Sequence, residues 1–347
     1  MLIIGWHYTQ HSANAPYGDE WAILTSYQTI NSYIALILGS WGQLGVSLFI
    51  MVSAWFLCDT SYTKKSKIIL LILQTWILSI IIYAVCLLSR NANFSVGAFL
   101  REILTPFFGQ YWFITNYCIY LVLVPYINIF IKNNLGSLKK ICILLTLFVP
   151  LYNNILDGPF GVISWFIYIH IVMTFLKQQK NNFFERNRYI GCILSIILVL
   201  LLEIFVISIP LFYSVSPESI KFLLERINGR CIFILLPALF LFFIFKNWNL
   251  AFHPIINTLA KATLTIYIFH ENIVFRSSKN IGIPALLWDK LLHADFYFNT
   301  PYFFLHMIFC ILLIYLLGTL IHLCGTFIAD TFFKCAIDKI RLLDKKS

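Results

Sequence analysis

The sequence predicts an all-α, polytopic integral membrane protein with about ten transmembrane helices. Of its 347 residues, 60% are hydrophobic and only 12% are charged, whereas soluble domains carry about 25% charged and 45–50% apolar residues. The apolar residues form regularly spaced runs, each about long enough to cross a hydrocarbon core of about 30 Å. The formal net charge of +10 fits cytoplasmic loops that face anionic lipid, so we expect membrane lipids as partners and no nucleic acid.

The first apolar runs differ in length. Segment 42–57, GQLGVSLFIMVSAWFL, together with the apolar residues from Tyr33 onward predicts a full membrane helix that ends at a basic edge. Segment 1–8 is too short to span a bilayer, so we expect that residues have been lost before Met1. The alternative is a short first helix that its neighbours shield. Further membrane helices are expected at Ile68–Leu88, Trp112–Ile131, Ile141–Ile155, Val162–Leu176, Ile190–Phe212, Cys231–Phe245, Ile255–Phe275 and Phe303–Ile328.

The distribution of Lys and Arg predicts the orientation. If the N-terminus lies inside, the segments expected inside hold 16 of these residues and those expected outside hold 8. Basic residues accumulate in cytoplasmic loops. We therefore expect a single domain over residues 1–347, in the cell membrane, with both termini in the cytoplasm.

Ionisable side chains at membrane depth are costly and are therefore candidates for function. His7 and His11 lie one helical turn apart. This spacing can bind zinc, but no third ligand is evident, so we expect no metal. General-base chemistry needs only one imidazole with a tuned pKa, and we assign it to His7, with a purely structural histidine as the alternative. Glu203 and His170 also lie within predicted helices, without evident partners.

Other polar groups stand at predicted helix ends. His270 and Glu271 precede Arg276 by about a turn and a half, so the acid and the arginine could orient the imidazole. The alternative is an interfacial salt-bridge cluster. Lys64, Lys65 and Lys67 could capture the phosphates of an anionic cofactor, although such residues commonly serve only as a positive-inside anchor.

These landmarks, in this order, resemble the membrane-bound acyltransferase family 3, the integral O-acyltransferases of bacterial surface polysaccharides, over nearly the whole chain. The resemblance is strongest to the stand-alone ten-helix members. It rests on His7 after an apolar run, on the G-x-x-G-V pattern that begins at Gly42, and on two later motifs. These motifs are Gln110-Tyr111-Trp112-Phe113 and Ile266-Tyr267-Ile268-Phe269-His270-Glu271, followed by Arg276 and Trp288.

The chain departs from the family pattern at two places. Many members carry R-x-x-R where this chain has Lys64, Lys65 and Lys67, which keep the charge but lose the bidentate geometry of arginine. The family also has an arginine before the first helix, and this chain begins after that point.

The resemblance implies an acyl-CoA donor, usually acetyl-CoA, on the cytoplasmic side, and a carbohydrate or lipid-linked glycan hydroxyl as acceptor. Arg276 or Arg101 would stabilise the developing oxyanion. The aromatic residues Tyr111, Trp112 and Trp288 would stack on a sugar face, or else only anchor the protein at the membrane interface. Two alternatives remain at this point: a polytopic carrier or flippase of a lipid-linked saccharide, and an inactive truncated remnant.

Overall fold

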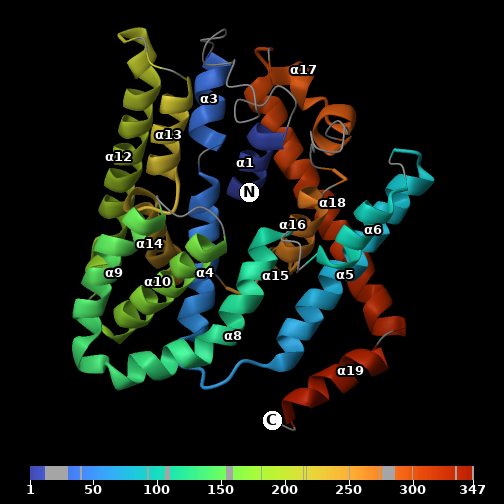
Figure 1. Ribbon diagram of the computed structural model, residues 1–347, viewed down its shortest axis with the longest axis horizontal. Helices are drawn as coiled ribbons and strands as arrows, with labels where there is room; N and C mark the ends of the chain where they lie inside the picture. Colours follow the sequence, from blue (N-terminus) through green and yellow to red (C-terminus); the bar gives the residue numbers. More distant parts are fainter. Residues whose placement is uncertain are drawn as a thin grey trace. The chain divides into compact units, whose positions relative to one another are not determined.

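The computed structural model describes a helical protein, and none of the described residues forms a β-strand (Figure 1). The described residues are 1–11, 30–39, 41–91, 94–105, 110–153, 159–180, 182–213, 215, 217–249, 251–272, 274–275, 286–298, 300–332 and 334–345. The chain divides into two compact units. The first unit comprises Met1–Gln10, Asp19–Tyr62 and Ile119–Asn249, and the second comprises His11–Gly18, Thr63–Cys118 and Leu250–Ser347.

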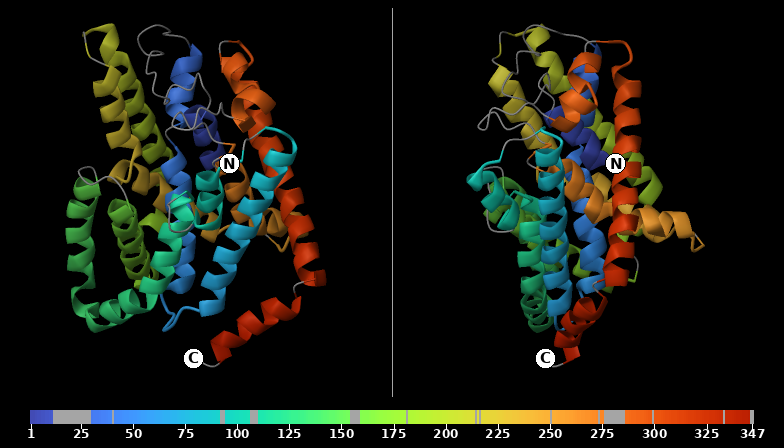
Figure 2. Two further views of the ribbon diagram at one scale, coloured as in Figure 1. Left: turned by 45° about the vertical axis from the view of Figure 1, so that its right-hand side comes forward. Right: turned by 90° about the vertical axis from the view of Figure 1, so that its right-hand side faces the viewer.

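The first unit is built around α4 (Gly42–Leu57), which is the second part of the membrane helix expected from Tyr33 to Leu57. The first part of that expected helix belongs to α3 (Ile30–Gly39), which ends at Gly39, so the single helix is not confirmed. Helices α10 and α14 pack on α4, α9 packs on α10, and α12 packs on α14 (Figures 1 and 2). The other helices of this unit are α1 (Leu2–His11, up to Gln10), α3 (Ile30–Gly39), the second part of α8 (Trp112–Asn133), α9 (Leu138–Asn153), α10 (Pro159–Gln178), α11 (Phe183–Arg186), α12 (Arg188–Ser208), α13 (Pro217–Asn228) and α14 (Ile232–Lys246), with short 3-10 turns at Leu135–Ser137 and Ile209–Leu211.

The two glycines at the start of α4 let α1 lie close against it. A Cβ atom at Gly42 would come within 2.6 Å of the Trp6 ring, and one at Gly45 would lie 3.0 Å from the Ile3 side chain. Any larger residue at Gly42 would have to displace the indole. The G-x-x-G spacing therefore fixes the contact that places His7, the residue after Trp6.

In the second unit, α16 (Thr263–Glu271) packs against both α5 (Lys65–Leu88) and α18 (Phe303–Phe332). The remaining elements are α6 (Val96–Ile103), the first part of α8, α15 (Pro254–Lys261), η4 (Leu286–Leu291), α17 (Ala294–Phe298), α19 (Lys334–Leu342) and η5 (Leu343–Lys345). Helix α5 buries only 22% of its most apolar window and α18 only 28%, so most of their apolar surface is left for lipid.

The helix expected at Ile255–Phe275 is broken. Helix α15 ends at Lys261, Ala262 forms a turn, and α16 runs only from Thr263 to Glu271. The Thr263 hydroxyl donates to the Ala260 carbonyl at 2.8 Å, a local bond that competes with the regular helical ladder. Hydropathy alone does not reveal this break, because both sides of it are apolar.

Six stretches of the described residues are long and apolar enough to cross a membrane. They are Lys65–Leu88, Trp112–Asn133, Phe160–Gln178, Arg188–Ser208, Phe222–Lys246 and Phe303–Phe332. Gly42–Leu57 is a shorter apolar helix. The all-α membrane class is therefore confirmed, whereas the count of ten is not.

Candidate active site

His270 is a buried histidine near the end of α16, and its own helix fixes its tautomer. Its Nδ1 atom lies 2.5 Å from the carbonyl oxygen of Ile266, one turn earlier, and the side chain is 1% exposed. Because a carbonyl only accepts, Nδ1 must carry the proton, and the neutral ring then has its lone pair at Nε2. This is the form that a general base requires. Glu271, the next residue, is also 1% exposed.

Helix α16 is held on two sides within the second unit. The Gln74 amide of α5 donates to the Thr265 hydroxyl at 3.0 Å, and that hydroxyl lies 3.2 Å from Nδ1 of His322 on α18. A Cβ atom at Gly318 of α18 would come within 2.9 Å of the Ile266 Cα atom. The glycine thus allows backbone contact between α18 and the turn of α16 that accepts the His270 hydrogen bond.

A buried polar network lies at the end of α16. The Glu102 carboxylate of α6 accepts hydrogen bonds from Ser79 of α5, from Gln110 just before α8 at 3.3 and 3.4 Å, and from Asn272 at 3.3 Å. The Tyr111 hydroxyl lies 3.1 Å from Ser79 and accepts from Asn272 at 3.0 Å. Four elements of the second unit therefore meet at one carboxylate.

Burial raises the pKa of Glu102, which is 0% exposed, while the donors Ser79, Gln110 and Asn272 act in the opposite direction. An apolar cluster of Tyr111, Ile114, Tyr267 and Ile268 adjoins the network. The Tyr267 ring meets both the Tyr111 ring and the His270 ring edge to face, at 6.1 and 6.0 Å between centroids.

The three lysines expected to bind the donor stand at the start of α5 and are exposed: Lys64 is the N-cap residue, and Lys65 and Lys67 lie in the first turn. One anion already occupies this turn. The Asp344 carboxylate of η5 accepts from the Ser66 backbone N–H at 3.0 Å and from the Ser66 hydroxyl. These bonds hold the pKa of Asp344 below its usual value. A helix N-terminus with added lysines is suited to phosphate.

The residues expected at the acceptor differ in accessibility. Arg101 on α6 is exposed, and Trp112 at the start of α8 is partly exposed. Tyr111 and Trp288 are buried, with exposed fractions of 1% and 0%. Arg276 lies outside the described residues.

His7 belongs to the first unit, on α1, and is 2% exposed. Its ring lies 4.7 Å from the Trp6 ring, centroid to centroid, and Trp6 in turn lies against Gly42. His11 ends the same helix. The burial of His7 is consistent with a residue on a helix that packs in the protein. The expected contrast in exposure with His11 and the catalytic role of His7 are still predictions.

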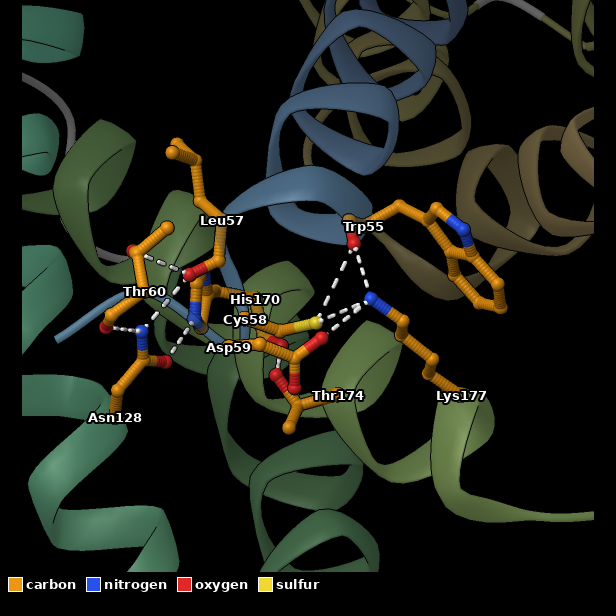
Figure 3. Close-up of polar contacts among 9 residues, drawn as sticks. All are labelled: Trp55, Leu57, Cys58, Asp59, Thr60, Asn128, His170, Thr174 and Lys177. Atoms are coloured by element: carbon orange, nitrogen blue, oxygen red, sulfur yellow. Dashed lines mark hydrogen bonds and ion pairs between the residues drawn. The ribbon is translucent and has the colours of Figure 1, made fainter.

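A second buried histidine of the first unit has partners that the sequence did not reveal (Figure 3). His170 lies between the Tyr120 hydroxyl, 2.7 Å from Nδ1, and the Asn128 amide oxygen, 2.8 Å from Nε2. The Asn128 amide nitrogen donates to the carbonyls of Leu57 and Thr60, both at 2.8 Å. His170 therefore supports the asparagine that holds the C-terminal end of α4.

Two groups in these networks carried only weak sequence signals. Glu102 is a single acid within an apolar stretch, and Asn272 directly follows the His270-Glu271 pair, so depth and adjacency could have marked them. Glu203, the lone acid of α12, accepts from the Trp41 indole N–H at 3.3 and 3.4 Å.

Comparison with known proteins identifies the family. Residues 1–319 match the family model described as an acyltransferase domain of family 3. No curated protein and no solved structure gave a significant match. Because the family match covers most of the 347 residues, the chain belongs to the acyltransferase family 3 and is a membrane acyltransferase that transfers groups other than amino-acyl groups.

Proposed function

We propose that this protein transfers an acyl group, most simply acetyl, from acyl-CoA to a hydroxyl of a cell-surface or exported polysaccharide. The family match supports acyl transfer. The observation that carries the finer proposal is the burial of two histidines, His7 and His270, of which His270 has its lone pair at Nε2 in the neutral form. Such an imidazole suits the activation of a hydroxyl, which at neutral pH is a weak nucleophile until a base removes its proton.

The reaction follows from the chemistry of a thioester and an alcohol. The acceptor oxygen attacks the acyl carbon while an imidazole takes the hydroxyl proton, and a new C–O bond forms. The tetrahedral intermediate then collapses, the C–S bond breaks, and the thiolate of CoA leaves and is protonated. We assign proton removal to His7, with His270 and Glu271 as a second catalytic pair. Arg276 or Arg101 would stabilise the oxyanion.

The donor is proposed to bind at Lys64, Lys65 and Lys67. This proposal is supported by the first turn of α5, where the Ser66 backbone N–H and hydroxyl donate to the Asp344 carboxylate and can therefore bind an anion. Phosphate groups of CoA would meet the same N–H groups and the surrounding ammonium groups. We place this edge on the cytoplasmic side of the cell membrane. At the acceptor end, Arg101 and Trp112 are the accessible candidates for contact with a sugar.

The test compares two histidines on the same helix. His7→Ala is expected to reduce acyl transfer by about 10²–10⁴-fold, the usual contribution of a general acid–base group. His11→Ala is expected to leave most of the activity, because His11 lies nearer the polar segment 12–16 and is less able to hold a shifted pKa. The assay follows labelled acyl groups from acyl-CoA into polysaccharide in membranes that contain each variant.

The amount and membrane insertion of each variant must be matched to the unmodified protein, because loss of a structural histidine also lowers protein level. Near-normal transfer by a correctly inserted His7→Ala protein would overturn the role of His7. No transfer by the unmodified protein from acyl-CoA to any polysaccharide hydroxyl would overturn the proposed function as a whole.

A further inference from the structure

Asn272 connects the end of α16 to three other elements of the second unit. Its amide nitrogen donates to Tyr111 at 3.0 Å and to Ser79 and Glu102, both at 3.3 Å. Its amide oxygen accepts from the backbone N–H of Val274 at 2.9 Å, which shapes the turn that follows the helix. Asn272 is 0% exposed, and it is the residue at which α16 ends.

The Glu102 carboxylate determines which group donates in each hydrogen bond of the network. When Glu102 is ionised, the one Ser79 hydroxyl proton goes to its carboxylate, so Tyr111 is the donor in its contact with Ser79. The Tyr111 oxygen then accepts from Asn272. Each donor in this chain finally points toward the carboxylate, which accepts only. An amide or a hydroxyl at position 102 would place a proton against one of these donors.

The network is connected to the proposed catalytic pair, His270 and Glu271, through the chain itself. Asn272 follows Glu271 directly and stands two positions after His270. The other end of this turn is fixed by the contact of Ile266 with Gly318 and by the hydrogen bond from His270 to the Ile266 carbonyl. The helix end is thus held at one side by packing and at the other by Asn272. A displacement of about 1 Å at a reacting group is enough to cost about 10²-fold in rate.

We propose that Glu102 is a positioning residue for acyl transfer, which acts by holding Asn272 and thereby fixes the end of α16 that carries His270 and Glu271. This inference rests on the proposed function. Glu102 itself has no exposed surface and its oxygens receive donors from Ser79, Gln110 and Asn272. It therefore acts through Asn272 and does not contact the substrate.

The decisive experiment exchanges the two side chains. In Glu102→Gln the carboxylate becomes an amide whose N–H groups face Asn272, and in Asn272→Asp two carboxylates face each other. Each single change is expected to lower kcat by about 10- to 100-fold. The double variant, Glu102→Gln with Asn272→Asp, restores one donor, one acceptor and the original net charge. It is expected to recover about tenfold relative to either single variant, because coupled residues are not additive.

A kinetic split separates positioning from donor binding. The KM for acyl-CoA should stay within about twofold in all three variants, because α5's first turn is untouched. The control is Glu185→Gln, which removes one carboxylate from an exposed pair with Lys246 in the first unit and should leave kcat unchanged. Thermal unfolding of each purified variant identifies any variant that fails to fold. If Glu102→Gln does not fold, the Asn272→Asp and double variants still test the inference.

A second readout does not need activity. Diethyl pyrocarbonate modifies unprotonated histidine, and mass spectrometry of the digested protein reports its rate at His270. Loosening the end of α16 in Glu102→Gln should raise that rate by about threefold or more, and the double variant should return it toward the original value. If the unmodified protein shows no acyl transfer, the proposed function fails and this labelling still tests the positioning. Unchanged kcat and labelling in the single variants, or losses that simply multiply in the double variant, would overturn the inference.

Discussion

Side chains from other helices satisfy the carbonyls at the C-terminal end of α4. Lys177 of α10 donates to the Trp55 carbonyl at 2.9 Å and to Asp59 at 2.7 Å, and Asn128 of α8 donates to Leu57 and Thr60 (Figure 3). The last carbonyls of a helix have no partners within it. These two long-range donors supply them, and they tie α4 to α8 and α10.

The Asp59–Lys177 pair gives a prediction with a defined pH dependence. The Lys177 ammonium lowers the pKa of Asp59, so this carboxylate stabilises the fold above its ordinary pKa, and the contribution disappears as pH falls through the lowered value. Asp59→Asn should therefore reduce stability at neutral pH, by less than about 1 kcal/mol because the pair is exposed. The side chain of Asp59 is 78% exposed.

Thermal unfolding of both proteins in detergent, repeated from pH 7 downward, measures this difference. The gap between the unmodified protein and Asp59→Asn should be constant from pH 7 to about pH 5 and should close below about pH 4. A gap of the same size at every pH would show that the carboxylate charge does not stabilise the fold.

At the scale of elements, α5 receives its N-terminal cap from far along the chain. Its N-cap residue, Lys64, makes no capping hydrogen bond with its own side chain, and Asp344 binds the Ser66 N–H instead. The segment η5 is thereby joined to the basic turn where we propose that acyl-CoA binds. A carboxylate and a phosphate would compete for the same donors.

Asp344→Asn is expected to lower the KM for acyl-CoA, because the variant keeps the shape of the side chain and loses the competing charge. The expected factor is about two to five, the range that charges at helix ends produce. Asp338→Asn is the matched control, since Asp338 is on α19 but pairs with Arg341 of the same helix. Equal KM values for Asp344→Asn and the unmodified protein would show that Asp344 does not compete with acyl-CoA for this turn.

For the whole molecule, the broken stretch α15–α16 bears directly on topology. Helix α16 has nine residues, about 14 Å of helix, which is less than half of a hydrocarbon core of about 30 Å. The topology predicted from the sequence has four crossings between residue 182 and the C-terminal tail, and this stretch is one of them. The orientation therefore depends on whether α15 and α16 together cross the membrane.

Reporter fusions at Asn182 and Lys346 are expected to lie on the same, cytoplasmic side, because the segments around both positions are rich in Lys and Arg. A pair of reporters, one active only in the cytoplasm and one only outside, makes each assignment independent. Opposite sides for the two positions would show that the stretch between them crosses an odd number of times, and the predicted topology would be wrong.

The sequence by itself determined the class of the protein, the family and most helix positions. Trp112–Ile131 was expected and α8 spans Trp112–Asn133, and Ile190–Phe212 was expected where α12 spans Arg188–Ser208. Hydropathy is a local property, and the membrane requires a long apolar run wherever the chain crosses it. The order of short motifs then sufficed to predict the family that the comparison confirmed.

Only the tertiary structure decided which polar groups meet. Asn272 contacts Glu102 across 170 positions of sequence, and Asn128 reaches Leu57 across 71. A periodic pattern predicts which face of a helix is buried but not which residues that face contacts. The hydrogen-bond donors of a lone acid such as Glu102 are therefore known only from the packing of α5, α6, α8 and α16. The break at Ala262, where the Thr263 hydroxyl donates to the Ala260 carbonyl, also became visible only in the structure.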